Sequence, residues 1–180
     1  MVDLETARNI AADFLQKQNS NSTIELELIE NPILSGDYGW VFGYNSAEYL
    51  RTKSLSSALA GNAPILVEKE TGNVVTTGTA RPLESYIDSY IEFGDPNVVA
   101  GTRIALLSVS QAISQPITIV KTIRDHCKMG LADAKKVYED CMQGRVVNLN
   151  LTWVETARRT ALALQRLGLE VRRLPAEPDQ

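Results

Sequence analysis

The stretch "DYGWVFGYNS", residues 37–46, indicates a β-sheet in the first half of the chain. Large aromatic residues fall on one parity of this stretch, at Tyr38, Trp40, Phe42 and Tyr44. An extended backbone places residues of one parity on one side of the strand. The rings then form either one wall of a core, as large aromatic residues usually do, or an exposed stripe through which Trp40 and Tyr44 contact a partner.

A helix and a further strand are predicted before this stretch. Apolar residues at three-and-four spacing predict a helix over residues 4–15, with Asp3 as its N-cap. The segment "TIELELIE", residues 23–30, alternates apolar and acidic residues. This period of two predicts a strand whose solvated face carries Glu25 and Glu27.

A hairpin and a second helix are predicted after it. Residues 65–68 and 74–77 read as paired strands joined by a turn at Gly72, a residue type that tolerates positive φ. The segment "RPLESYIDSYIEFG" has Pro82 where a first helical turn accepts it, followed by apolar residues at helical spacing over residues 83–91. The first half is therefore expected to run helix, strands, helix.

Three segments of this half, "GWVFGYNSAEYL", "LAGNAPILVEKETGNV" and "TGTARPLESYIDSY", together resemble the YrhB-like immunity protein 35 family. The shared features are a tryptophan-bearing strand, a glycine turn at Gly72 and a tyrosine-containing helix, over roughly residues 4–93. The resemblance implies a small cytoplasmic bacterial protein that binds and neutralises the toxin of a polymorphic toxin system. It implies binding rather than catalysis.

The two halves of the chain differ in the sign of their net charge. Residues 1–100 carry 6 Lys and Arg against 14 Asp and Glu, a net −8, whereas residues 101–180 carry 12 against 8, a net +4. An acidic module attracts a basic partner and accelerates its association, which suits a cationic toxin. The alternative is an ordinary acidic surface, because net charge bears on association rather than on the identity of a partner.

The second half opens with a predicted strand at residues 104–107 and a helix that begins near Pro116. Gly130 is expected to end this helix as its C-cap residue. Three basic side chains at spacings of three, four and seven residues are expected to share its outer face: Lys121, Arg124 and Lys128.

The stretch "MGLADAKKVYED", residues 129–140, predicts a second amphipathic helix. Its expected apolar face consists of Leu131, Ala134, Val137, Tyr138 and Cys141. A third helix is predicted between the strands "GRVVNLNL" and "LEVRRL", where Thr152 and Glu155 have the spacing of a capping box.

The order strand, helix, helix, strand, helix, strand, together with "VKTIR", "MGLADAKKVYE" and "ETARRTALALQRLGLEVRRL", resembles the C-terminal domain of the acidic ribosomal stalk protein of bacteria. The resemblance spans roughly residues 102–174 and implies that Lys121, Arg124 and Lys135 contact a translational GTPase. Pro116, His126, Cys127 and the basic charge depart from the pattern of that family. The alternatives are that these basic residues are only solvated, or that they bind another acidic protein or RNA; no stacking aromatic residue lies among them to favour nucleic acid.

Patterns of catalytic and metal-binding residues are not found in the sequence. There is one histidine, His126, and no nucleophile elbow, phosphate loop or dinucleotide fingerprint. His126 is expected to interact with the end of a helix dipole. Cys127 and Cys141 are expected to be reduced thiols that fill the core. We therefore predict no enzyme activity, no cofactor and no metal.

The sequence thus predicts the α+β class with two small α+β domains. Residues 1–97 form the immunity-like domain, with the N-terminal helix packed on an antiparallel sheet, and residues 101–175 form the stalk-like domain. A signal peptide and a membrane span are absent, so the expected location is the cytoplasm. The expected partner is a protein, a toxin first and a translational GTPase second, and the oligomeric state stays open.

Overall fold

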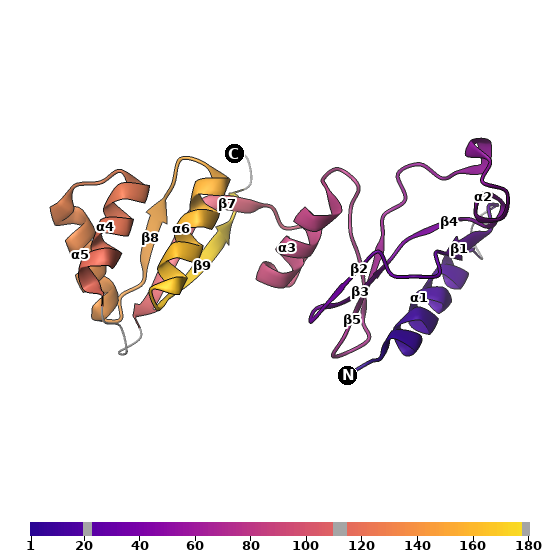
Figure 1. Cartoon of the computed structure of the whole chain (residues 1–180), viewed down its shortest axis with the longest axis horizontal. Helices are drawn as coiled ribbons and strands as arrows, with labels where there is room; N and C mark the ends of the chain where they lie inside the picture. The colour runs from indigo at the N-terminus through magenta and orange to yellow at the C-terminus, as the bar shows by residue number, and fades with distance from the viewer. Residues whose placement is uncertain (20–22, 110–114, 178–180) are drawn as a thin grey trace. The chain divides into compact units, whose positions relative to one another are not determined.

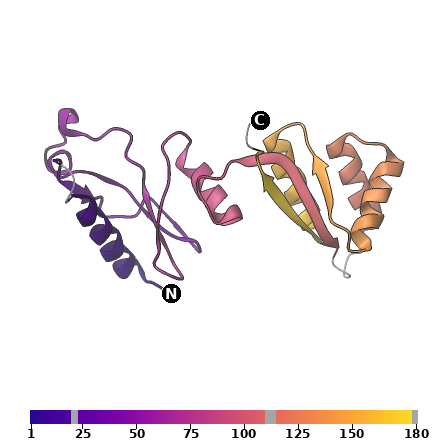
Figure 2. The same cartoon turned by 180° about the vertical axis from the view of Figure 1, so that it is seen from behind.

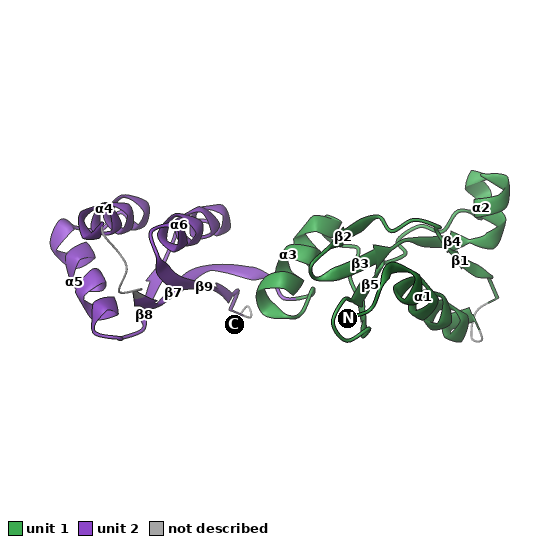
Figure 3. Cartoon of the chain, turned by 60° about the horizontal axis from the view of Figure 1, so that its bottom comes forward, with its two compact units in different colours: residues 1–97 green, residues 98–180 purple. Residues whose placement is uncertain are grey.

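The structure is a computed structural model, and it describes residues 1–19, 23–109 and 115–177. The chain divides into two compact units, Met1–Asn97 and Val98–Gln180, shown in different colours in Figure 3. Each unit combines helices with antiparallel strands, which confirms the predicted α+β class.

The first unit carries a curved antiparallel sheet with one long helix at its start (Figure 1). Its elements in chain order are α1 (Leu4–Asn19), β1 (Leu26–Leu28), β2 (Leu34–Gly36), β3 (Gly39–Phe42), β4 (Tyr44–Ser46), α2 (Ala47–Thr52), η1 (Leu55–Ser57), β5 (Ile65–Glu68), β6 (Val74–Thr76) and α3 (Leu83–Phe93). As predicted, the Asp3 carboxylate caps α1, accepting a hydrogen bond of 2.8 Å from the Thr6 N–H.

The strands form a four-stranded sheet in the order β2-β3-β5-β6 and a two-stranded sheet of β1 and β4. Gly43 alone separates β3 from β4. The Gly43 carbonyl accepts a hydrogen bond of 2.9 Å from Ile29 N–H, just beyond β1. The pairing of β1 with β4 therefore continues along the same edge on which β2 pairs with β3.

The sheet lies between the helices α1 and α3 (Figure 2), and the residues of two small cores lie on its two faces. On the α1 face, Phe42 and Ile65 pack against the buried helix residues Ala7 and Ala11. On the α3 face, the buried residues are Val41, Leu66 and Ile87. This division follows from the alternation of side chains along β3 and β5.

The aromatic stretch is divided between the two cores. Trp40 and Tyr44 pack with Phe42 on the α1 face, as the core interpretation predicts, but Tyr38 packs on the other face. The reason is that Tyr38 lies in the two-residue turn between β2 and β3, which pair from Gly36 to Gly39, so it is outside the strand alternation. Ile24 also differs from the predicted strand pattern, because it precedes β1 and is 46% exposed.

The second unit is a three-stranded antiparallel sheet in the order β8-β7-β9, with helices packed on it. Its elements are β7 (Ala100–Val109), α4 (Pro116–Cys127), α5 (Leu131–Met142), β8 (Val147–Asn150), α6 (Val154–Arg166) and β9 (Leu169–Pro175). Figure 3 shows α4 and α6 on one side of the strands. The core between sheet and helices includes the fully buried Ile104, Leu106, Ile119 and Ile123.

Three details of the helix ends differ from the sequence prediction. Lys128, not Gly130, ends α4 in the left-handed conformation, with φ of 54°, and Gly130 is the N-cap of α5. Lys128 therefore leaves the helical face that Lys121 and Arg124 share. Trp153 occupies the N-cap of α6 without a side-chain cap hydrogen bond, so the capping box at Thr152 is wrong.

The predicted apolar face of α5 is right except at its first residue. Ala134 and Cys141 are buried, and Val137 and Tyr138 pack against the core. Leu131 is 59% exposed, because it lies at the start of the helix, before the turn that faces the core.

A carboxylate in the first unit joins the β5–β6 turn to α3. Glu68 accepts hydrogen bonds from the hydroxyls of Thr71 and Tyr90 and, at 3.1 Å, from the side-chain amide of Asn73. These bonds hold the pKa of Glu68 below its ordinary value of 4.5, and the bond from Thr71 has the largest effect. Burial and the bond to Glu68 raise the pKa of Tyr90.

We expect Glu68→Gln to destabilise the first unit by about 1 kcal/mol at pH 7, because the charged acceptor is lost. The lowered pKa means that the carboxylate contributes stability above its ordinary pKa of 4.5 and loses it as the pH falls through the folded value. The difference in the free energy of unfolding between wild type and variant should therefore become smaller at acid pH. Urea unfolding between neutral and acid pH measures it, with the exposed Glu70→Gln as control; a difference independent of pH would contradict the assignment.

Candidate functional site

The strand β1 lies at an edge of the sheet, because among the described residues it pairs with β4 alone. The register pairs Glu27 with Asn45, and the Glu25 carbonyl accepts a hydrogen bond of 2.9 Å from Ala47 N–H. In an antiparallel pair, alternate residues direct their backbone groups toward the partner strand. The backbone N–H and C=O groups of Glu25 and Glu27 thus point toward β4. Those of Leu26 point away from β4, toward the outer edge of the sheet.

The last residue of α1 occupies this outer edge. The Asn19 side chain accepts a hydrogen bond of 2.9 Å from Leu26 N–H and donates one of 3.1 Å to the Leu26 carbonyl. A carboxamide has a donor and an acceptor side by side, as a peptide group of a neighbouring strand has. Asn19 therefore occupies the position at which a neighbouring strand would pair with Leu26 of β1.

A groove of about 730 Å³ runs between α1 and β1. Among the described residues, its charged lining consists of Asp13, Glu25, Glu27 and Glu30 and of one basic residue, Arg8. The Arg8 Nε is buried and has no hydrogen-bond partner within the part of the chain that the structure describes. The groove therefore presents a net negative surface beside a strand edge on which, among the described residues, only Leu26 has a partner.

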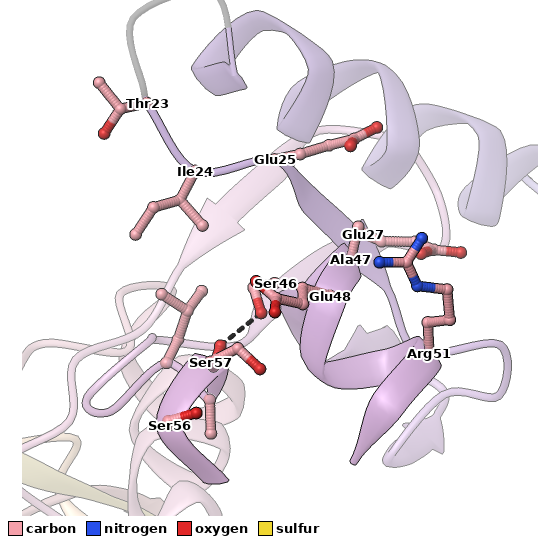
Figure 4. A pocket seen from close by; sticks show the side chains of 12 residues that line it. Thr23, Ile24, Glu25, Glu27, Ser46, Ala47, Glu48, Arg51, Ser56 and Ser57 are labelled. Carbon is pink, nitrogen blue, oxygen red and sulfur yellow. Dashed lines mark hydrogen bonds between the residues drawn. The ribbon is translucent and has the colours of Figure 1, made fainter. Parts of the chain in front are cut away.

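A second pocket, of about 710 Å³, lies between β1, α2 and η1. Glu25 and Glu27 line it as well as the groove, so β1 is the wall that the two cavities share. Figure 4 shows the Arg51 side chain reaching the side of this pocket on which Glu27 lies. The pocket adds Glu48 to the acidic side chains around β1.

Polar side chains on β4 hold the loop that completes this pocket. Ser46, which is 3% exposed, accepts a hydrogen bond of 3.0 Å from Tyr49 N–H at the start of α2. Its hydroxyl donates to the Ser57 carbonyl in η1, the dashed line in Figure 4. The neighbouring Asn45 side chain accepts from Leu59 N–H at 2.8 Å. These bonds fix α2 and η1 against the end of β1 and β4.

The two aromatic residues predicted as partner contacts are half-buried. Trp40 packs against the core under α1, and the Lys69 ammonium lies 5.7 Å from the centre of its ring. Tyr44 packs against the same core, and its burial raises its pKa. The structure places both on the α1 face of the sheet, and neither lines the groove or the pocket beside β1.

The basic residues predicted in the second unit lie on α4, at its C-cap and on α5. Lys121 and Lys135 are exposed. Arg124 donates to Asp125 at 2.7 Å, and the Lys135 ammonium lies 3.5 Å from the Glu139 carboxylate. These neighbouring carboxylates partly offset the positive charge of the predicted GTPase surface.

The single histidine has a partner other than the predicted helix end. His126 Nδ1 lies 2.9 Å from the hydroxyl of Thr160, which itself donates to the Thr156 carbonyl at 2.7 Å. Because the Thr160 proton is used in that second bond, His126 Nδ1–H is the donor of the first. The pair joins α4 to α6.

Both cysteines are free thiols in the core of the second unit. Burial raises the pKa of Cys127 and of Cys141 to about 11. Thiols in this state are poor nucleophiles at neutral pH. Their role is the predicted one of filling space.

The described ranges hold no group of three or more metal-ligating side chains. Within the same ranges no helix is long and apolar enough to cross a bilayer. The site beside β1 presents acidic side chains and the backbone groups of a strand edge.

Residues 5–89 match the family model of Immunity protein 35. This range lies within the first unit and contains α1 except for its first residue, β1, α2 and every described residue of the acidic groove. The predicted resemblance of the first half to that family is thereby confirmed.

One curated protein provides a second comparison, the "Uncharacterized protein YrhB" of Escherichia coli (strain K12). It is 42% identical over 52 residues, which cover 29% of this chain and 55% of that protein. The chain thus spans about half the length of the curated relative it matches. No solved structure matches the chain. The predicted resemblance of the second half to the ribosomal stalk protein stays a prediction.

The sequence patterns do not indicate the groove. The alternation places Glu25 and Glu27 on a solvated strand face, and no pattern indicates a role for Asn19, Asp13 or Arg8. The local signal is the acidic run Glu25, Glu27 and Glu30 in "ELELIE". It does not show that α1 borders the outer edge of the strand, because a pattern within one strand does not specify how a helix packs beside it.

Proposed function

We propose that this chain is a bacterial immunity protein that binds a toxin and blocks it by occlusion. The observation that carries the proposal is the match of residues 5–89 to Immunity protein 35. We assign this role to a domain of residues 1–97 acting in the cytoplasm. The role is stoichiometric binding rather than catalysis.

The charge of the first unit supports a basic toxin as the partner. Residues 1–97 hold 6 Lys and Arg against 14 Asp and Glu, and the carboxylates around β1 are part of that excess. Such a surface raises the association rate of a cationic protein, and the effect declines with salt. The solvent-facing parts of Trp40 and Tyr44 are further proposed contacts.

The test is to express the full chain in bacteria together with a candidate secreted toxin from the same organism. We expect the full chain to restore growth and to form an equimolar complex of roughly nanomolar affinity with an inactivated toxin. An unrelated toxin serves as the specificity control. In vitro, inhibition should saturate at one equivalent of chain per toxin.

Two results would refute the proposal. One is a toxin that kills cells equally with and without the chain. The other is complete inhibition by far less than one equivalent, which would require the chain to act as an enzyme on the toxin.

A second candidate function concerns residues 101–175, as an adaptor for a translational GTPase. It is supported by the element order β7-α4-α5-β8-α6-β9 and by the exposure of Lys121 and Lys135 on adjacent helices. Arg124 and Lys128 complete the proposed basic contact. Binding to another acidic protein is the nearest alternative.

Purified elongation-type GTPase provides the test. Replacing Lys121, Arg124 and Lys135 together by alanine should weaken binding at least about tenfold, because the charged contacts are lost. Arg159→Ala, on the exposed side of α6, is the control. Absence of binding by the wild type, or equal binding by the triple variant, would remove this function.

A further inference from the structure

We infer that the groove between α1 and β1 receives an extended, basic segment of the partner, which adds to β1 as a new strand. The inference rests on the proposed function for the existence of a toxin partner, and it names the surface and the mode of binding. Three observations support it: the free backbone edge of β1, the charge of the groove and the position of Asn19.

The backbone of β1 offers a pairing position beside the one that Asn19 fills. Leu26 and Leu28 have the same parity, so both direct N–H and C=O away from β4. Asn19 satisfies both groups of Leu26. For the Leu28 groups, the described residues provide no hydrogen-bond partner, and an incoming strand would satisfy them.

The geometry of Asn19 resembles the first step of strand addition. Its carboxamide already makes the donor–acceptor pair that a peptide group of a third strand would make at Leu26. A partner segment can therefore continue the ladder from Leu28 without displacing Asn19. The groove of about 730 Å³ beside this edge accommodates its side chains.

The charges select the occupant. The acidic residues Asp13, Glu25, Glu27 and Glu30 are all among those that line the groove, so lysine or arginine side chains of the segment would lie close to opposite charges. A second copy of this chain would instead bring Glu27 against the same acidic edge, and like charges across strands repel. Charged edges of this kind prevent self-association, and here they still admit a strand of opposite charge.

The probe for the test is a synthetic peptide of roughly six residues that alternates lysine and valine, the length of a typical strand. We expect it to bind the full chain and to slow the hydrogen exchange of Leu28 N–H. The same peptide with alternate amides N-methylated keeps its charge but cannot pair, and it should bind at least about tenfold more weakly. A glutamate–valine peptide should not bind.

Paired charge reversals provide matched variants. Glu25→Lys with Glu27→Lys should weaken peptide binding at least about tenfold. Glu70→Lys with Glu84→Lys changes the net charge equally on exposed positions outside the groove and should have less than about a threefold effect. Circular dichroism and thermal unfolding verify that both double variants are folded.

Three results would overturn the inference. They are equal binding of the N-methylated peptide, equal losses in the two double variants, or unchanged exchange of Leu28 N–H at saturation. Each would mean that the acidic edge acts only as a net charge or only as protection against self-pairing.

Failure of the inference and failure of the proposed function give different patterns. The peptide assay uses no toxin, so peptide binding at Leu28 without toxin neutralisation would refute only the immunity role. Neutralisation that survives Glu25→Lys with Glu27→Lys at wild-type affinity would refute only the groove.

Discussion

Gly39→Ala is expected to destabilise the first unit by about 3 kcal/mol or more, enough to unfold a marginally stable domain. Gly39 begins β3 with φ of 142°, a conformation that side chains disfavour, and a Cβ there would lie 2.1 Å from the Val67 carbonyl oxygen. That oxygen belongs to the paired strand β5, so the clash cannot be relieved by rotating a side chain. Loss of toxin binding should accompany the unfolding.

Gly61→Ala provides the control for backbone strain alone. Gly61 also has a positive φ, of 75°, but a Cβ there meets no atom within 4 Å. Gly61→Ala should lower the free energy of unfolding by about 1 kcal/mol, the strain of a residue in the left-handed conformation. Urea unfolding followed by hydrogen exchange of first-unit amides distinguishes the two variants. Equal and small losses of stability at both positions would contradict the pairing of β3 with β5.

Ile104→Ala is expected to destabilise the second unit by about 2–5 kcal/mol, because it leaves a cavity at the centre of the core. Ile104 is 0% exposed on the central strand β7, where it packs among residues of the helices and of both neighbouring strands. The exposed Ile117→Ala, at 71% exposure on α4, removes the same atoms without a cavity and should cost within about 0.5 kcal/mol.

Urea unfolding measured on second-unit amides tests this difference. Similar losses in both isoleucine variants would show that β7 is not the centre of the core. Peptide binding gives an additional readout: because the groove lies within the first unit, Ile104→Ala should leave peptide binding at Leu28 within about threefold of wild type.

Local patterns predicted most elements correctly. The Asp3 cap, the hairpin of β5 and β6 and the α3 segment after Pro82 are as expected, since each depends on residues close together in sequence. Apolar periodicity likewise predicted the order of the second unit. The short elements β2, α2 and η1 were missed, because three to six residues give too little periodicity to detect.

Errors at helix ends have a physical cause. Gly130 is the residue type that favours a left-handed C-cap, yet Lys128 adopts that conformation and ends α4 earlier. Thr152 has the composition of a cap, yet Trp153 holds the position. In both cases the packing of the helices on the sheet decided the boundary, since capping preferences of about 1 kcal/mol are smaller than the burial of core residues.

The sequence by itself determined the α+β class, the change of charge between the halves, and a candidate partner class through the resemblance of the first half to Immunity protein 35. It also assigned Glu25 and Glu27 to a solvated strand face. Only the tertiary structure decided that α1 borders β1, that Asn19 closes Leu26 and that an acidic groove lies beside Leu28. The reason is that alternation within a strand orients its side chains, whereas the neighbour of its outer edge depends on how separate elements pack, and no local pattern specifies that packing.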